Sequence, residues 1–197
     1  MPDVPALCDS HKEILLKVAR AAVEYGLEGG QILAVDVETY PPEIQAVGAT
    51  FITLRIEEAL RGCIGSLRPL RPLVADAAYN AHGAAFRDPR FAALDRDEMA
   101  TLGIQVSVLS PFEEVRFTSE AELLAQVRPG VDGLFLEAEE QQHKATLLPA
   151  VWASLPDAAT FVRHLKIKAR LPQDYWSETL KIWRYTTESF SEVRNES

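Results

Sequence analysis

Cysteine is scarce in this chain. Its 197 residues include only Cys8 and Cys63, which lie far apart and form no CxxC pair. This spacing excludes a disulfide framework and a cysteine-based zinc knuckle. The four histidines show no HxH or HExxH spacing either, so the sequence predicts no metal site and two reduced thiols.

Signatures of the standard enzyme classes are also missing. The chain has no Gly-rich phosphate loop, no GxSxG and no kinase signature. No cofactor is therefore predicted, and no residue pattern by itself names a reaction.

Positive charge is in deficit as well. The 20 Lys and Arg residues against 29 Asp and Glu give a net charge of -9, which repels phosphate backbones, so no nucleic-acid partner is predicted. No stretch approaches the ~18 apolar residues that cross a bilayer. The first residues, MPDVPALCDSHKE, are acidic instead of basic and then apolar. We therefore expect a cytoplasmic protein with no membrane partner.

What is present is the composition of a globular protein. Hydrophobic residues make up 47% and charged residues 25% of the chain. A chain of this length corresponds to one domain or to two small lobes. It buries roughly 70% of its unfolded surface, so a stable core needs no disulfide or metal.

Periodicity predicts strands in hairpins that are interrupted by helices. Helical spacing covers residues 11–25, 72–86 and parts of 151–171, and capping-box spacings begin two shorter helices near Asp95 and Ser119. Alternating patterns predict strands in ATFITLRI, LRGCIGSL, IQVSVLSP, GLFLEAE, KATLL and LKIWRYTTESF. Because regular βαβ alternation is absent, the fold class is α+β with mainly antiparallel sheets.

Several motifs carry a resemblance to a known family. They are LRGCIG, a Pro-Leu pair, an alanine-rich helix, FRDPRF, IQVSVLSPFEEV, PGVDGLFLE, LLPAVW and FVRHLKIKARLPQDYW, which follow one another over residues 10–192. In this order they resemble the AMMECR family. Its bacterial relatives are known as system protein A of the AmmeMemoRadiSam set, which implies Memo-type and radical-SAM proteins as partners. No reaction is established for the family.

The resemblance also implies two interacting α+β subdomains, each with a mainly antiparallel sheet and flanking helices. We expect residues 1–67 and 118–197 to form the larger one, and residues 68–117 to form a smaller inserted one, bracketed by Pro69 and Pro111. Many relatives carry Cys and Gly where this chain has Lys166 and Arg170. A family mechanism based on that Cys would fail here.

The LRGCIG strand supplies the first candidate site. Strand alternation predicts that Arg61, Cys63 and Gly65 share one face, while Leu60 and Ile64 serve the core. Gly62 and Gly65 would let a ligand or another backbone approach closely.

Cys63 has two interpretations. A nearby Arg61 cation would lower the pKa of the thiol and favour the nucleophilic thiolate. Alternatively, Cys63 is a small buried hydrophobe in a tight hairpin, which we favour for lack of a neighbouring base.

FRDPRF supplies the second candidate site. Its proline forces extended backbone before it, so Asp88 and Arg90 can flank one turn. They can bond to each other as a structural latch, which we favour, or contact a ligand.

A basic face on the helix near the end of the chain has a simpler interpretation. Arg163, Lys166 and Arg170 lie on one helical face, followed by tryptophans. We interpret them as a solvated face beside core aromatics, because the net charge disfavours nucleic acid.

These features leave three hypotheses for function. The first is an accessory protein that binds a small-molecule ligand or a partner in a cleft between the subdomains, around the LRGCIG strand. The binding residues would be Arg61, Gly62, Gly65, Asp88 and Arg90. The second is an enzyme with Cys63 as nucleophile or proton donor, and the third is a structural adaptor. The oligomeric state is not predicted.

Overall fold

The chain folds into two compact units, each with its own hydrophobic core. The computed structural model describes residues 7–138 and 142–192. Among these residues, unit A comprises 7–109 and 188–192, and unit B comprises the described part of Ser110–Thr187. No helix among the described residues is long and apolar enough to cross a membrane.

The predicted division of the chain differs from these units. Residues 68–109 belong to unit A and do not form a separate lobe, because Leu73 and Ile104 lie in the same buried cluster as Leu15 and Ile52. The second cluster begins at Val115 and lies within unit B. The chain therefore passes from one core to the other near Ser110, about forty residues later than predicted.

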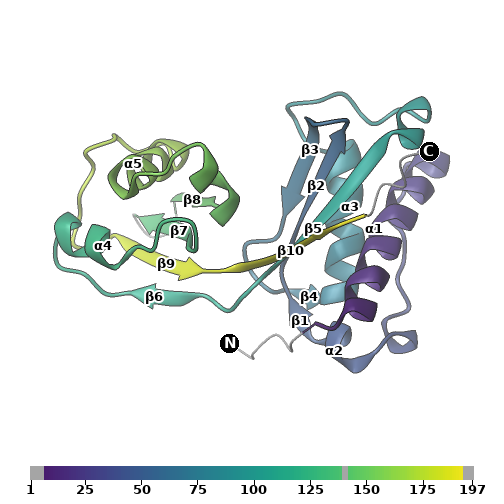
Figure 1. Ribbon diagram of the computed structural model, residues 1–197, viewed down its shortest axis with the longest axis horizontal. Coiled ribbons are helices and arrows are strands. Elements are labelled where there is room, and N and C mark those ends of the chain that lie inside the picture. Colours follow the sequence, from purple (N-terminus) through teal and green to yellow (C-terminus); the bar gives the residue numbers. More distant parts are fainter. Residues whose placement is uncertain (1–6, 139–141, 193–197) are drawn as a thin grey trace. The chain divides into compact units, whose positions relative to one another are not determined.

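Unit A is a four-stranded sheet with two long helices on one face (Figure 1). The long helices are α1 (Asp9–Gly29) and α3 (Leu73–Phe86), and the sheet strands are β2 (Thr50–Ile56), β3 (Ala59–Gly65), β5 (Leu102–Leu109) and β10 (Thr187–Ser191). The short elements are η1 (Val37–Thr39), α2 (Pro42–Gln45), β1 (Val47–Gly48), β4 (Arg71–Pro72) and η2 (Asp97–Ala100).

The order of the strands makes β3 one edge of this sheet. The order is β10-β5-β2-β3, and β2 pairs antiparallel with both β3 and β5. Ile52, Leu54, Ile104 and Val106 alternate along their strands and are buried against the helices. The α+β class with antiparallel sheets is confirmed.

Unit B has a second antiparallel sheet with its own helices. Its elements are β6 (Glu113–Val115), α4 (Glu120–Gln126), β7 (Gly133–Ala138), β8 (His143–Leu147), η3 (Pro149–Ala153), α5 (Ala158–Lys168) and β9 (Lys181–Tyr185). The strand order is β6-β9-β7-β8. Leu134, Leu136 and Ile182 face a core completed by Phe161 and Leu165 of α5.

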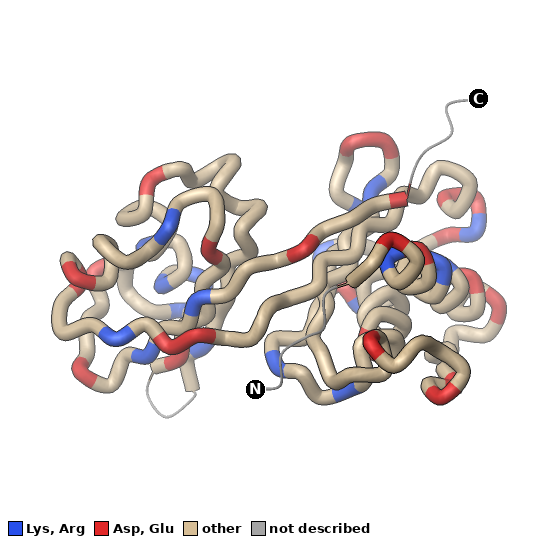
Figure 2. The backbone as a smooth tube through the Cα atoms, turned by 60° about the horizontal axis from the view of Figure 1, so that its bottom comes forward, with Lys and Arg blue, Asp and Glu red and all other residues tan. Residues whose placement is uncertain are grey.

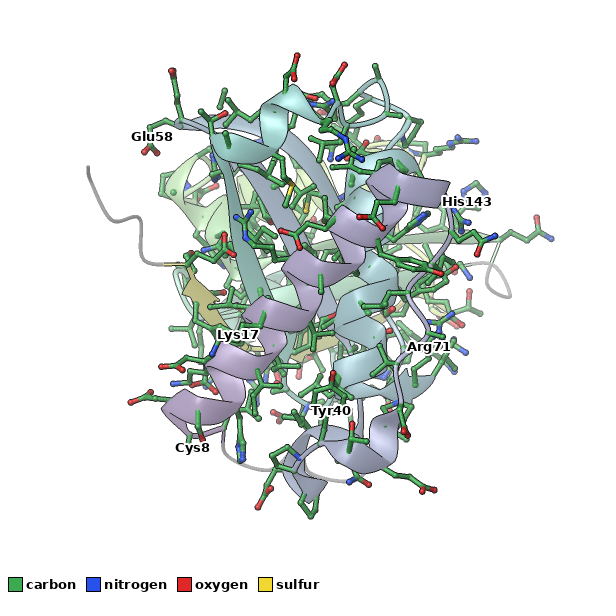
Figure 3. The ribbon with its side chains drawn as sticks, turned by 90° about the vertical axis from the view of Figure 1, so that its right-hand side faces the viewer. Cys8, Lys17, Tyr40, Glu58, Arg71 and His143 are labelled. Atoms are coloured by element: carbon green, nitrogen blue, oxygen red, sulfur yellow. The ribbon has the colours of Figure 1, made fainter. Side chains whose placement is uncertain are left out.

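Helix ends follow the capping chemistry at some positions and depart from it at others. The Ser119 hydroxyl accepts from the backbone N–H of Glu122, which confirms the cap predicted for α4. The first helix, predicted from residue 11, begins earlier, because α1 starts at Asp9, with Cys8 at the N-cap position and no side-chain cap bond. Figure 3 shows Cys8 at that end of α1. The helix ends at Gly29 and is capped by Gly30, whose φ of 69° favours glycine.

The basic helix face is only partly solvated. Arg163 is exposed, but Lys166 is fully buried and its Nζ donates to Glu120 Oε1 at 2.8 Å. The solvated interpretation is therefore wrong for Lys166, since this ammonium is desolvated and held by a carboxylate of α4. Across both units, charges of the two signs are interspersed along the chain (Figure 2).

Candidate functional site

A β-bulge interrupts the LRGCIG strand at Arg61. Leu54 pairs with Gly62 and Arg55 pairs with Leu60, so Arg61 has no partner on β2. The extra residue breaks the alternation of side chains along β3. Leu60 is therefore 38% exposed and does not serve the core as predicted, whereas Ile64, beyond the bulge, packs against it.

The Arg61 guanidinium is already neutralised by a carboxylate of η2. Its Nε and Nη2 donate to the two Glu98 oxygens at 2.6 and 2.9 Å, and Nη2 also reaches the Ala93 carbonyl. These bonds from Arg61 lower the pKa of Glu98. Arg61 is thus not an uncompensated cation available to Cys63, which removes the main support for an activated thiol.

The Cys63 thiol is half-buried on β3. Its side chain lies opposite Thr53 in the strand pairing, and the Thr53 hydroxyl is 3.5 Å from Sγ. Thr53 supplies a weak hydrogen bond and no general base. The side chain of Cys63 therefore has neither a paired base nor a free cation among the contacts described.

Asp88 and Arg90 meet the backbone of the same cysteine. Asp88 Oδ2 accepts from the Cys63 N–H at 2.9 Å, and Arg90 Nη2 approaches the Cys63 carbonyl at 3.4 Å. The two side chains also pair with each other, with Arg90 Nε and Nη2 at 2.9 and 2.6 Å from the carboxylate. Because β3 is an edge strand, this pair satisfies backbone groups that would otherwise be open to another strand.

The environment of Asp88 also changes its ionisation. The hydrogen bond from Arg90 and, more weakly, the N–H of Cys63 lower the pKa of Asp88 to about 2. The Phe91 ring lies near both guanidiniums, with the carbons of Arg61 and Arg90 at 5.8 and 5.4 Å from its centroid. Cys63, Asp88, Arg90 and Arg61 are therefore close together, in contacts that describe a latch on the sheet edge.

The two glycines of the motif are both covered by protein. A Cβ on Gly62 would lie 2.1 Å from the carbonyl oxygen of Ala84 in α3. A Cβ on Gly65 would lie 2.2 Å from the Phe51 ring. Gly62 therefore allows close packing of strand on helix, and Gly65 makes room for an aromatic ring from the neighbouring strand, so neither leaves space for a ligand.

A buried polar network around Asp76 was not predicted from the sequence. The Asp76 carboxylate, in the first turns of α3, accepts from the Thr50 backbone and hydroxyl, from Ser66 and from Asn80, at 2.7 to 2.9 Å. Arg71 completes it at 3.3 Å. Burial raises the pKa of Asp76 despite these donors. The available signal was an Asp and an Asn four residues apart in an alanine-rich helix.

The sheet face opposite α1 and α3 is a further feature of unit A, and we call it the polar face. Thr53 pairs with Cys63 on one side and with Gln105 on the other, and Ser107 pairs with Phe51. Paired residues share a face of the sheet, and these alternate with the buried Ile52, Leu54, Ile104 and Val106, so they lie on the polar face. Next to them is a hollow of about 370 Å³, lined by Thr53, Arg55, Gly103, Gln105 and Ser191 together with Glu57, Glu58, Ile104 and Glu192. Hydroxyl and amide groups on a regular strand can hold a polar ligand in a fixed orientation.

No grouping of three or more His, Cys, Asp or Glu side chains suitable for a metal ion occurs in residues 7–138 and 142–192. A cleft between the two subdomains stays a prediction.

Comparisons with known proteins all find relatives that match nearly the whole length of this chain. A family model described as AMMECR1 matches residues 16–190. Protein MJ0810 of Methanocaldococcus jannaschii is 35% identical over 182 residues, which cover 90% of this chain and 88% of that protein. The crystal structure of uncharacterized protein PH0010 from Pyrococcus horikoshii is similar with a TM-score of 0.86 and 34% identity, covering 94% of this chain and 93% of that one.

Proposed function

Because the chain belongs to the AMMECR1 family, we propose that it is an accessory protein that binds a ligand or a partner on the polar face of unit A. Its partners would be a Memo-type and a radical-SAM protein. The observation that carries the proposal is the hollow beside Thr53 and Gln105, on the face that α1 and α3 leave to polar side chains.

The charges around this hollow favour an uncharged polar group as the bound moiety. Arg55 is the cation of the lining, against carboxylates of Glu57, Glu58 and Glu192. Arg61 and Arg90 are each held by a carboxylate at two points. An anion in the hollow would meet more carboxylates than cations, and the neighbouring Arg61 and Arg90 are already paired, whereas an amide or hydroxyl group needs only the neutral donors and acceptors of Thr53 and Gln105.

The test is titration of the purified chain with each purified candidate partner. We expect binding to weaken at least about tenfold in Thr53→Ala/Gln105→Ala, since two hydrogen-bonding groups are worth about 1.5 kcal/mol or more together. Gln31→Ala, at an exposed glutamine of the same unit, is the matched control. Absence of binding by the wild type, or equal binding by the double variant, contradicts the proposal.

An enzyme that uses Cys63 is the second candidate. It is supported by the half-buried thiol on the same face, within reach of the Thr53 hydroxyl. If Arg61 activates this thiol, Arg61→Gln should slow alkylation of Cys63 between pH 6 and 8. An unchanged rate leaves the binding function as the explanation of the motif.

A further inference from the structure

A small aromatic pocket lies in unit B, outside the surface used by the proposed function. It has a volume of about 290 Å³ and is lined by Phe117, Thr118, Trp176, Ser177, Glu178 and Leu180. Phe117 and Thr118 follow β6, and the other four residues lead into β9. Because β6 and β9 are paired in the sheet, these two segments are held at the same end of it.

Two aromatic rings form a corner of this pocket. The rings of Phe117 and Trp176 have centroids 5.7 Å apart and an interplanar angle of 59°. Trp176 is 38% exposed, and Leu180 of the same lining is buried. The arginine–ring contacts described in this chain involve Phe91 and Tyr79, so no guanidinium is described over either ring of the corner.

The polar groups of the lining are mostly acceptors. Glu178 is exposed and has no hydrogen bond or ion pair among the described residues. The Thr118 hydroxyl donates its proton to Glu122, which leaves its oxygen lone pairs available. The lining contains no lysine or arginine.

We propose that this pocket binds an alkylammonium group. An indole face is the best aromatic partner for an organic cation, and a carboxylate at the rim adds direct charge attraction. An anion would meet the Glu178 carboxylate and no cation of the lining. A neutral apolar group would gain from the rings but nothing from the carboxylate. The cation can belong to a free quaternary amine or to a lysine side chain of a partner.

The test uses choline chloride and its uncharged isostere 3,3-dimethyl-1-butanol, at constant ionic strength. The readout is the NMR signal of the Trp176 indole N–H, which is assigned by its loss in Trp176→Phe. We expect the signal to shift saturably with choline. The affinity obtained for the isostere should be at least about threefold weaker than that for choline. A parallel titration with Nα-acetyl-lysine amide distinguishes a lysine side chain from a quaternary amine.

Two variants separate charge from packing. Glu178→Gln keeps the shape of the pocket and should weaken choline binding about two- to fivefold. Asp174→Asn, at an exposed carboxylate outside the lining, is the matched control and should not change it. Equal binding of choline and isostere, an equal effect of both variants, or no saturable shift with either cation overturns the proposal.

Discussion

The two cysteines differ in their surroundings, and the difference favours Cys8 as the more reactive thiol. Cys8 is exposed at the N-terminus of α1, and its Sγ lies 3.0 Å from the Ser10 hydroxyl. That hydrogen bond, helped by the backbone N–H of His11, lowers the pKa of Cys8. Cys63 is half-buried and its nearest guanidiniums are paired.

We therefore expect iodoacetamide to modify Cys8 faster than Cys63 at pH 7, measured by mass spectrometry of the peptides. Ser10→Ala should slow the reaction at Cys8 and leave Cys63 unchanged. Faster modification of Cys63 would instead revive the enzyme interpretation.

Asp88 should make the stability of unit A depend on pH in acid. Its pKa is lowered from 3.8 to about 2, so the folded protein keeps the carboxylate charged where the unfolded chain protonates it. The stabilisation is complete above pH 4 and is lost as the pH falls through 2. A shift of this size corresponds to about 2 kcal/mol.

Asp88→Asn removes this contribution. Urea denaturation should show a free energy of unfolding lower by about 2 kcal/mol at pH 7 and a smaller difference near pH 2. Asp36→Asn, at an exposed carboxylate of the same unit, is the control. A difference for Asp88→Asn that stays constant between pH 2 and 7 would mean that Asp88 acts through packing alone.

At the scale of elements, Gly62 allows β3 to pack closely against α3. A methyl group there would overlap a backbone carbonyl, which cannot rotate away as a side chain can. Gly62→Ala should therefore lower the free energy of unfolding by about 3 kcal/mol. Gly29→Ala, in the last turn of α1 with nothing within 4 Å, should be neutral or slightly stabilising. Chemical denaturation of both variants measures the difference, and equal effects would refute the close packing.

The sequence predicted elements better than it predicted their ends and faces. Alternation in ATFITLRI and IQVSVLSP gives the buried face of β2 and β5 correctly, because those strands pair without interruption. The bulge at Arg61 depends on the pairing with β2, which no local pattern encodes. The burial of Lys166 was not predicted for a similar reason, because its partner Glu120 is 46 residues away in the sequence.

The candidate site was likewise predicted where it depends on local sequence and missed where it depends on the tertiary fold. That Asp88 and Arg90 form a latch followed from the turn chemistry of FRDPRF. That the latch closes on the backbone of Cys63, while a different carboxylate neutralises Arg61, required the tertiary fold. The Asp76 network was missed because its bonds to Thr50 and Ser66 join segments that periodicity treats separately.

At the scale of the whole molecule, the two separate cores predict separate local unfolding. Phe161 is completely buried in unit B and stacks on Trp152 at 3.9 Å. Phe161→Leu should speed hydrogen exchange at the amides of β7 far more than at those of β2. Ile52→Ala in unit A should do the reverse. Equal acceleration in both sheets, measured by mass spectrometry, would indicate one cooperative core.

The place of β10 in the sheet has a consequence for the nascent chain. β5 lies between β2 and β10, yet β10 follows it only after all of unit B has been made. Until then β5 presents a full row of unpaired backbone groups at a sheet edge, the kind of surface that other chains join. Slow synthesis through unit B would prolong that exposure. Ribosome-bound chains halted before Thr187 should therefore aggregate more readily than chains halted after Glu192 has emerged.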